Sequence, residues 1–112
     1  MRILFTSTGE SWDSVIDPRF GRTEYLVLYD EESDSLSVTD NRSAKNEAHG
    51  AGRATAKVVS DLKPDILITG NGPGGNASGA IKGMNMKIFI NAHNLTIKEA
   101  YDNYRNKKLT EL

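Results

Sequence analysis

The hydrophobic pattern of the chain changes its period near residue 49, and this change constrains the fold more than any other feature. Before it, short apolar or alternating runs at 2–6, 23–30 and 35–40 are typical of β-strands. The first run, Ile3–Phe5 between Arg2 and Thr6, has no polar position, which favours a central strand covered on both faces. The charged stretch 31–34 predicts a hairpin turn between the other two runs.

After residue 49 the sequence alternates helix-type and strand-type segments. A helix is predicted to begin after His49 and to stop at Lys63–Pro64, because the residue before a proline avoids the helical backbone. Its apolar positions are Ala51, Ala54, Val58 and Leu62. Buried-type strands are predicted over 66–69 and 87–90. A short helix between them is marked by Ala77, Ala80 and Ile81 and ends at Gly83.

The last helix has the clearest start signal. Thr96, followed three residues later by Glu99, makes a capping box, which predicts a helix that begins directly after Thr96. Its apolar face consists of Ile97, Ala100, Tyr101 and Tyr104.

The element order β-β-β-α-β-α-β-α predicts an α/β fold with a mixed sheet. The first three strands form an antiparallel meander, and the helical crossovers to the last two strands are right-handed. The predicted sheet is five-stranded, in the order 3-2-1-4-5, with strand 2 antiparallel to the rest and helices on both faces. This is the ribonuclease H-like arrangement.

Length, charge and composition narrow the classes of function. A chain of 112 residues fits a single domain over 1–112. The net charge of -1 and the lack of a basic block argue against nucleic acid and membrane surfaces as partners. No stretch resembles a signal peptide or a membrane span, so we expect a cytoplasmic protein. The absence of cysteine excludes thiolate nucleophiles and cysteine-held metal sites.

The predicted topology brings four loops to one edge of the sheet. They cover residues 7–22, 41–52, 70–76 and 91–95, and they contain both histidines and most of the glycines. In open α/β sheets ligands bind outside the carboxyl ends of the strands, so this edge is the expected ligand site.

Two loops carry the most specific candidates. The glycine-rich stretch 70–76 joins a strand to a helix start, where free N–H groups favour an anion. His49 lies between Ala48 and Gly50 at the entry to a helix, and imidazole is the neutral nitrogen donor that a cysteine-free chain can offer a metal. His93 lies at the same edge without glycine neighbours. For the stretch 70–76, the alternative to an anion site is a tight turn that needs glycine. For His49, the alternative to a metal donor is a surface or capping histidine.

The long first loop adds Arg19 and Arg22 to the same edge. Arginine suits oxyanions through its planar fork of donors, and Arg42, Lys45 and Arg53 could add local positive charge. Asp17 is expected to form a turn and Phe20 to attach the loop to the core. The alternative is a solvated loop whose charges are balanced by nearby carboxylates. Trp12 is either a lid over the site or an anchor of the loop.

Three segments in this order carry a resemblance to a known family: Asp-Pro-Arg-Phe-Gly-Arg at 17–22, His-Gly-Ala-Gly at 49–52, and Thr-Gly-Asn-Gly-Pro-Gly at 69–74. Together they resemble the dinitrogenase iron–molybdenum cofactor biosynthesis family, which includes nitrogenase accessory proteins that carry the cofactor or its precursor. By that resemblance His49 matches the family histidine associated with cluster binding. The resemblance also implies an iron–molybdenum or iron–sulfur cluster precursor as ligand, and cofactor-assembly proteins as partners.

We expect a small cofactor-binding or carrier protein for an anionic metallocluster, and not an enzyme. The expected cofactor-binding residues, with His49 also as metal donor, are His49, Gly50, Gly52, Arg19, Arg22, Gly70, Asn71, Gly72 and Gly74. A regulatory or protein-interaction domain without a bound cluster is the alternative, followed by a metal-dependent hydrolase. Catalytic residues are not predicted, because the first strand lacks the acid that a two-metal nuclease needs and Asp65 precedes its strand at the other edge.

Overall fold

A mixed β-sheet forms the centre of the computed structural model, which describes residues 1–46, 49–73, 81 and 83–112. The sheet order is β3-β2-β1-β4-β5-β6. The strands are β1 (Arg2–Ser7), β2 (Tyr25–Asp30), β3 (Ser35–Asp40), β4 (Ile66–Ile68), β5 (Lys87–Ile90) and β6 (Thr110–Glu111). β2 is antiparallel to β1 and β3, whereas β1, β4 and β5 are parallel. The α/β class and the predicted order 3-2-1-4-5 are therefore confirmed.

The strand β6 was not predicted. It pairs antiparallel with β5 through Thr110 and Glu111, and the Leu112 N–H donates to the Ile88 carbonyl at 2.8 Å. A strand of two residues has no recognisable hydrophobic period, so only the partner strand identifies it.

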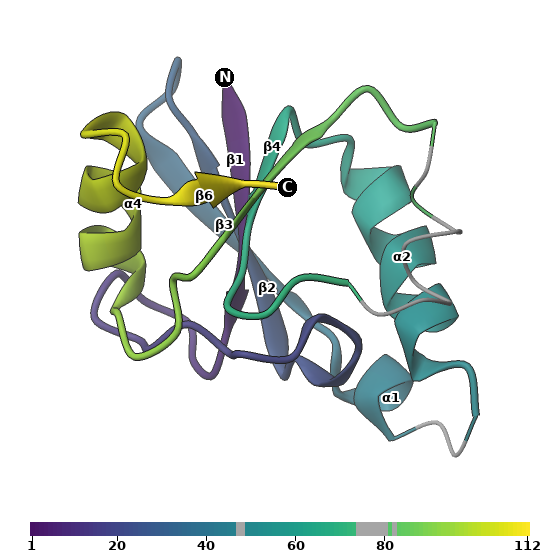
Figure 1. Cartoon of the computed structure of the whole chain (residues 1–112). Coiled ribbons are helices and arrows are strands. Elements are labelled where there is room, and N and C mark those ends of the chain that lie inside the picture. The colour runs from purple at the N-terminus through teal and green to yellow at the C-terminus, as the bar shows by residue number, and fades with distance from the viewer. Residues whose placement is uncertain (47–48, 74–80, 82) are drawn as a thin grey trace.

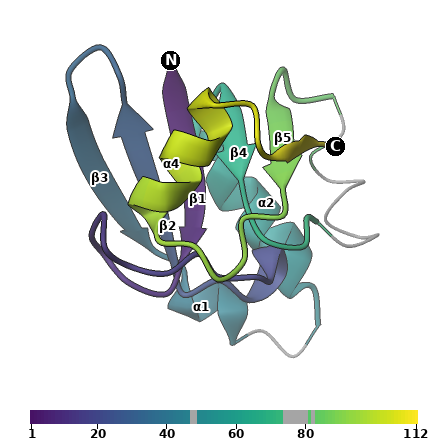
Figure 2. The ribbon, with the colours of Figure 1, turned by 60° about the vertical axis from the view of Figure 1, so that its left-hand side comes forward.

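Helices cover both faces of the sheet, as predicted (Figures 1 and 2). α2 (Ala51–Leu62), the short α1 (Arg42–Lys45) and the 3-10 helix η1 (Phe20–Arg22) contact one another on one face. α4 (Ile97–Arg105) lies on the other face. None of the helices in the described ranges is long and apolar enough to cross a membrane. Of the short helix predicted from Ala77, Ala80 and Ile81, the first two residues lie outside the described residues, whereas Ile81 is helical and buried.

Two apolar layers hold the helices on the sheet. Ile3 and Phe5 of β1 belong to the layer that includes Ile97 and Ala100 of α4, whereas Leu4 belongs to the layer that includes Val59 of α2. All of these side chains are buried. Adjacent residues of a strand point to opposite faces, so an apolar run without alternation is what a strand covered on both sides requires.

The two long helices follow their sequence signals to different degrees. In α4 the predicted capping box is present: the Glu99 N–H donates to Thr96 Oγ1 at 3.1 Å, and the Thr96 N–H donates to Glu99 Oε1 at 2.9 Å. In α2 the buried face is Ala51, Thr55, Ala56 and Val59. Of the face predicted for this helix only Ala51 is buried; Ala54, Val58 and Leu62 are half-buried, whereas Thr55 points inward and accepts a hydrogen bond from the Asn41 amide.

Candidate functional site

The loops that follow the strands meet at the carboxyl edge of β1, β4 and β5, as expected from the topology. We call the described parts of 8–22, 41–52, 70–73 and 91–95 the loop rim; it forms the lower edge in Figure 1. The Asn71 N–H donates to the Pro18 carbonyl at 2.9 Å, and the Ile16 N–H donates to the Leu95 carbonyl at 2.8 Å. These bonds connect the first loop of the rim with its third and fourth loops.

Two loops of the rim approach each other closely at Gly70, which is buried. A Cβ atom at this position would lie 2.6 Å from Pro18 Cα and 3.2 Å from His93 Cβ. Such distances are below normal carbon–carbon contact, so only glycine lets the backbones of these loops meet here. The start of the glycine-rich loop is therefore a packed junction, and it lies against His93 instead of His49.

The first loop is held down by two residues that the sequence singled out. Asp17 Oδ1 accepts a hydrogen bond from the Arg19 N–H at 3.1 Å, which is the predicted turn. Phe20 is only 2% exposed and packs in the α2 layer, as predicted. The Thr6 hydroxyl also hydrogen-bonds to the Asp17 carbonyl at 2.8 Å. Arg19 is thereby left exposed on a loop with a fixed backbone.

The N-terminus of α2 forms the other end of the rim. Its N-cap, Gly50, has a left-handed backbone with φ of 80° and provides no side-chain cap for the first helical N–H groups. A Cβ at Gly21 would lie 2.9 Å from Gly52 Cα, so η1 packs directly on the first turn of α2. The Thr55 hydroxyl donates to the Gly21 carbonyl at 3.3 Å. The helix end is therefore fixed in position beside the first loop.

Asn41 connects the loop after β3 to the same helix. Its side-chain amide donates to the Thr23 carbonyl at 3.1 Å and to Thr55 Oγ1 at 3.0 Å. The residue is 2% exposed, and its Oδ1 atom has no hydrogen-bond partner within the described residues. Sequence reasoning missed this connection, because its partners lie 18 and 14 residues away in the chain and follow no local pattern.

Two of the basic residues expected at the rim are paired with carboxylates. Arg42 Nη2 lies 2.7 Å from Asp40 Oδ2, and this hydrogen bond lowers the pKa of the Asp40 carboxyl to about 2. Lys45 Nζ lies 2.7 Å from Glu24 Oε1, and the hydrogen bond from the ammonium lowers the pKa of that carboxyl. Arg22 donates to the Lys45 carbonyl. Arg19 and Arg53 are both exposed.

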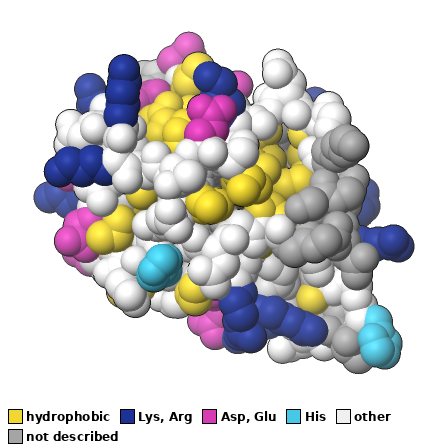
Figure 3. All heavy atoms as spheres, viewed as in Figure 1, with side chains coloured by type: hydrophobic (Ala, Val, Ile, Leu, Met, Phe, Trp, Pro, Cys, Tyr) yellow, Lys and Arg dark blue, Asp and Glu magenta, His cyan; other side chains and the backbone are white. Residues whose placement is uncertain are grey.

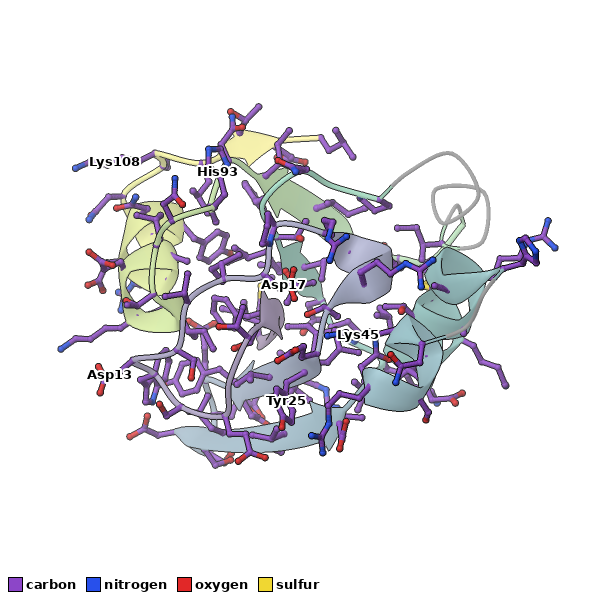
Figure 4. All side chains as sticks on the ribbon, turned by 90° about the horizontal axis from the view of Figure 1, so that it is seen from below. Asp13, Asp17, Tyr25, Lys45, His93 and Lys108 are labelled. Carbon is purple, nitrogen blue, oxygen red and sulfur yellow. The ribbon has the colours of Figure 1, made fainter. Side chains whose placement is uncertain are left out.

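The two histidines do not come together. Both are exposed, and Figure 3 shows them in cyan at separate places on one face, with Lys and Arg side chains gathered between them. In the view of the rim in Figure 4, Asp17 lies between His93 on one side and Lys45 on the other. Among residues 1–46, 49–73, 81 and 83–112, no three His, Asp or Glu side chains form a group that could hold a metal ion.

The predicted binding residues thus divide between the two ends of the rim. Five of them surround the first turn of α2 or belong to the first loop: His49, Gly50, Gly52, Arg19 and Arg22. Gly70, Asn71 and Gly72 are at the other end, and Gly74 lies outside the described residues. The segment 18–21 contacts both ends, through Pro18 and Gly21. Trp12 packs against Phe5, so it anchors the loop to the core.

Comparison with known proteins identifies relatives of the whole fold. The apo form of the orange protein from Desulfovibrio gigas shares 28% sequence identity over 99% of this chain and 92% of that chain, with a TM-score of 0.91. A protein from Thermotoga, provisionally assigned as NifB and placed in the DUF35 family, shares 29% identity over the same fractions, with a TM-score of 0.83. No curated protein sequence matches the chain.

A family model described as dinitrogenase iron-molybdenum cofactor matches residues 1–107. This match spans both long helices and all four loops of the rim. It includes the three segments on which the resemblance was based. The chain therefore belongs to the dinitrogenase iron-molybdenum cofactor family.

Proposed function

We propose that this protein binds and carries an anionic metal cluster of the iron–molybdenum or iron–sulfur type at the loop rim, without catalysing a reaction on it. The observation that carries the proposal is the N-terminus of α2, where a glycine N-cap leaves the first helical N–H groups without a side-chain cap. An exposed imidazole, His49, precedes this N-cap, and an exposed guanidinium, Arg53, is in the first turn. Helix N-termini favour anions through these N–H groups and the helix dipole.

The first loop supports the proposal, because it holds this helix end in a fixed position. Gly21 packs on Gly52, and the Thr55 hydroxyl bonds to the Gly21 carbonyl. A preformed anion site loses less entropy on binding than a site that must first be ordered. Arg19 extends from the same loop and is exposed, so it can pair with the outer atoms of a bulky anion.

The donor set suits a cluster better than a single metal ion. A mononuclear site usually needs three or four protein ligands, whereas a cluster brings its own sulfide or other bridging ligands and needs few protein donors. The chain has no cysteine, and each of its two exposed histidines can supply one imidazole nitrogen. The cluster is therefore cargo that His49 ligates and the basic groups neutralise.

A carrier must receive its cargo from one protein and release it to another. The family to which the chain belongs is named for the cofactor of dinitrogenase, and one structural neighbour is provisionally assigned as NifB. Cofactor-assembly proteins are therefore the partners we propose. Ligation by the single exposed imidazole of His49 suits such transfer, because this one bond to the cluster can be replaced by a ligand of the receiving protein without unfolding the site.

Anaerobic titration with extracted iron–molybdenum cofactor tests the proposal. Absorbance and metal analysis after gel filtration should show saturable uptake. His49→Ala should weaken binding roughly tenfold or more, since even outer-shell partners of a metal ligand cost 10–100-fold when they are removed. His93→Ala is the matched control, because it removes the other exposed imidazole at the opposite end of the rim. The fold of both variants is checked by circular dichroism.

The pH dependence distinguishes the two possible roles of His49. Ligation requires a neutral imidazole, so binding through a metal–nitrogen bond should weaken in acid. A hydrogen bond from imidazolium to the cluster should instead strengthen. If the wild-type protein takes up no cluster, the carrier proposal is wrong. If His49→Ala binds as the wild type does and His93→Ala does not, the cluster lies at the Gly70 end of the rim.

A further inference from the structure

A hollow separate from the predicted cluster-binding residues lies on the face of the sheet that carries α4. Its volume is about 400 Å³, which is within the range of small-ligand pockets. Three aromatic side chains from different parts of the chain line it: Trp12 from the first loop, Tyr29 from β2 and Tyr101 from α4. None of these residues is used by the site at the loop rim.

The three rings present their faces in different directions. The ring centroids are 4.9 Å apart for Trp12 and Tyr29, 5.9 Å for Trp12 and Tyr101, and 5.3 Å for the two tyrosines. The interplanar angles are 69°, 56° and 78°, in the same order. At these distances and angles the rings pack edge to face or at a tilt and form one aromatic wall of the hollow. The face of an aromatic ring is its negative side, so a cation can bind against a ring face that this packing leaves open.

Both tyrosine hydroxyls donate to carboxylates, which makes the rings more electron-rich. The Tyr29 hydroxyl donates to Asp34 Oδ1 at 2.7 Å, and the Tyr101 hydroxyl donates to Glu31 Oε2 at 2.6 Å. The hydrogen bond to Asp34 raises the pKa of Tyr29 to about 12, and burial followed by the bond to Glu31 raises the pKa of Tyr101. The phenols therefore keep their protons at neutral pH and polarise toward the carboxylates.

The charged lining of the hollow is mainly negative. Asp13, Asp34 and Asp102 contribute carboxylates, whereas Lys98 contributes the one positive charge among the described lining residues. Asp13 lies on the side of the molecule that carries α4 (Figure 4). Aromatic faces and an excess of carboxylates both disfavour an anion, so the hollow is complementary to a cation and differs in this respect from the rim.

The chain itself shows how a ring and a carboxylate can hold a guanidinium together. Arg42 Cζ lies 5.5 Å from the ring centroid of Tyr25 while its Nη2 is 2.7 Å from Asp40, so one guanidinium uses a ring and a carboxylate together. Arg105 Cζ lies 5.7 Å from the centroid of Tyr101. A guanidinium is planar and weakly hydrated, so it can stack on a ring while its edge N–H groups reach a carboxylate.

We propose that the hollow lined by Trp12, Tyr29 and Tyr101 is a binding site for a guanidinium group, with Asp13 and Asp102 as its carboxylate partners. The group can belong to a free guanidinium compound or to an arginine side chain of a partner protein, and the chemistry of recognition is the same. This site requires no cluster at the loop rim, so its test is independent of the carrier function.

The chain has a single tryptophan, Trp12, and its fluorescence therefore reports on the hollow directly. The protein is titrated at constant ionic strength with arginine blocked at both ends, and with blocked citrulline, which has the same shape without the charge. We expect a saturable fluorescence change with blocked arginine and none with blocked citrulline. Blocked lysine should bind more weakly, because an ammonium has no planar face to stack.

Carboxylate variants locate the site. Asp13→Asn and Asp102→Asn should each weaken binding of blocked arginine by up to about fivefold, the range for an exposed ion pair. The matched control is Asp61→Asn, an exposed aspartate of α2 on the other face of the sheet, which should leave the affinity unchanged.

Two further probes distinguish the sources of the group. Tighter binding of a Gly-Arg-Gly tripeptide than of agmatine supports an arginine of a partner protein, and the reverse supports a free guanidinium compound. A response to blocked citrulline equal to that of blocked arginine would overturn the proposal. So would an absence of any saturable response, or equal weakening by Asp61→Asn and Asp102→Asn.

Discussion

The packed junction at Gly70 makes a quantitative prediction for Gly70→Ala. The added methyl group would lie 2.6 Å from Pro18 Cα and 3.2 Å from both Pro18 Cβ and His93 Cβ. Favourable carbon–carbon contacts begin near 3.5 Å, so the backbone at Pro18 must move by about 1 Å. That movement would also strain the 2.9 Å hydrogen bond from the Asn71 N–H to the Pro18 carbonyl.

The expected cost follows from these contacts. Overpacking of this kind costs about 1–3 kcal/mol, and loss of one backbone hydrogen bond adds about 1 kcal/mol. Alanine lowers the entropy of the unfolded chain, which returns about 0.4–1 kcal/mol. The steric cost is larger, so Gly70→Ala should lose about 1–3 kcal/mol of unfolding free energy, or about 5–15 °C in Tm for a domain of this size.

Urea and thermal unfolding followed by circular dichroism measure this loss. Gly9→Ala is the control, because it adds the same methyl group to the first loop but meets only side-chain atoms of Ser14, namely its Oγ, which can rotate away, and its Cβ at 3.1 Å, and no backbone atom. It should stay within about 1 kcal/mol of the wild type. If Gly70→Ala is as stable as Gly9→Ala, and the Asn71 amide exchanges no faster than in the wild type, the loops are not packed against each other as described.

Three further predictions concern local contacts. Thr96→Ala removes the hydroxyl that accepts from the Glu99 N–H, so it should cost about 1 kcal/mol in urea unfolding; an unchanged midpoint would mean that α4 does not depend on this cap. The lowered pKa of Asp40 stabilises the fold above its ordinary value of 3.8, and this contribution is lost as the pH falls through about 2. An NMR titration should therefore give a midpoint near 2 for this carboxyl, and Arg42→Gln should return it toward 3.8. The raised pKa of Tyr29 acts in the opposite sense: its contribution is present below 10.0 and is lost as the pH rises through about 12. Alkaline spectrophotometric titration of Asp34→Asn should show Tyr29 ionising at lower pH, and an unchanged curve would remove the hydrogen bond as the cause.

The sequence by itself predicted the elements that depend on neighbouring residues. The capping box at Thr96 depends on residues three positions apart, and the apolar run Ile3–Phe5 identified a strand covered on both faces. The order of elements then favoured the observed order of the first five strands, because crossovers between parallel strands are right-handed. The same topology predicted that the loops meet at one edge of the sheet, and the motifs at 17–22, 49–52 and 69–74 indicated the family that the match over 1–107 shows.

The tertiary structure decided what depends on contacts between distant residues. Strand β6 exists only through its pairing with β5, and the buried Thr55 of α2 forms hydrogen bonds with Asn41 and Gly21, which lie far from it in the chain. The partner of Lys45 is Glu24, which lies 21 residues away in the chain, so no local pattern predicts this ion pair.

The hollow at Trp12 could not be predicted from the sequence either, because its three rings come from the first loop, β2 and α4, which are far apart in the chain. Hydrophobic periodicity indicates whether a segment is a helix or a strand, because it depends only on residues that are close together in the sequence. Which side chains of different segments meet is decided by close packing of the whole chain, because each contact depends on how every element fits against the others.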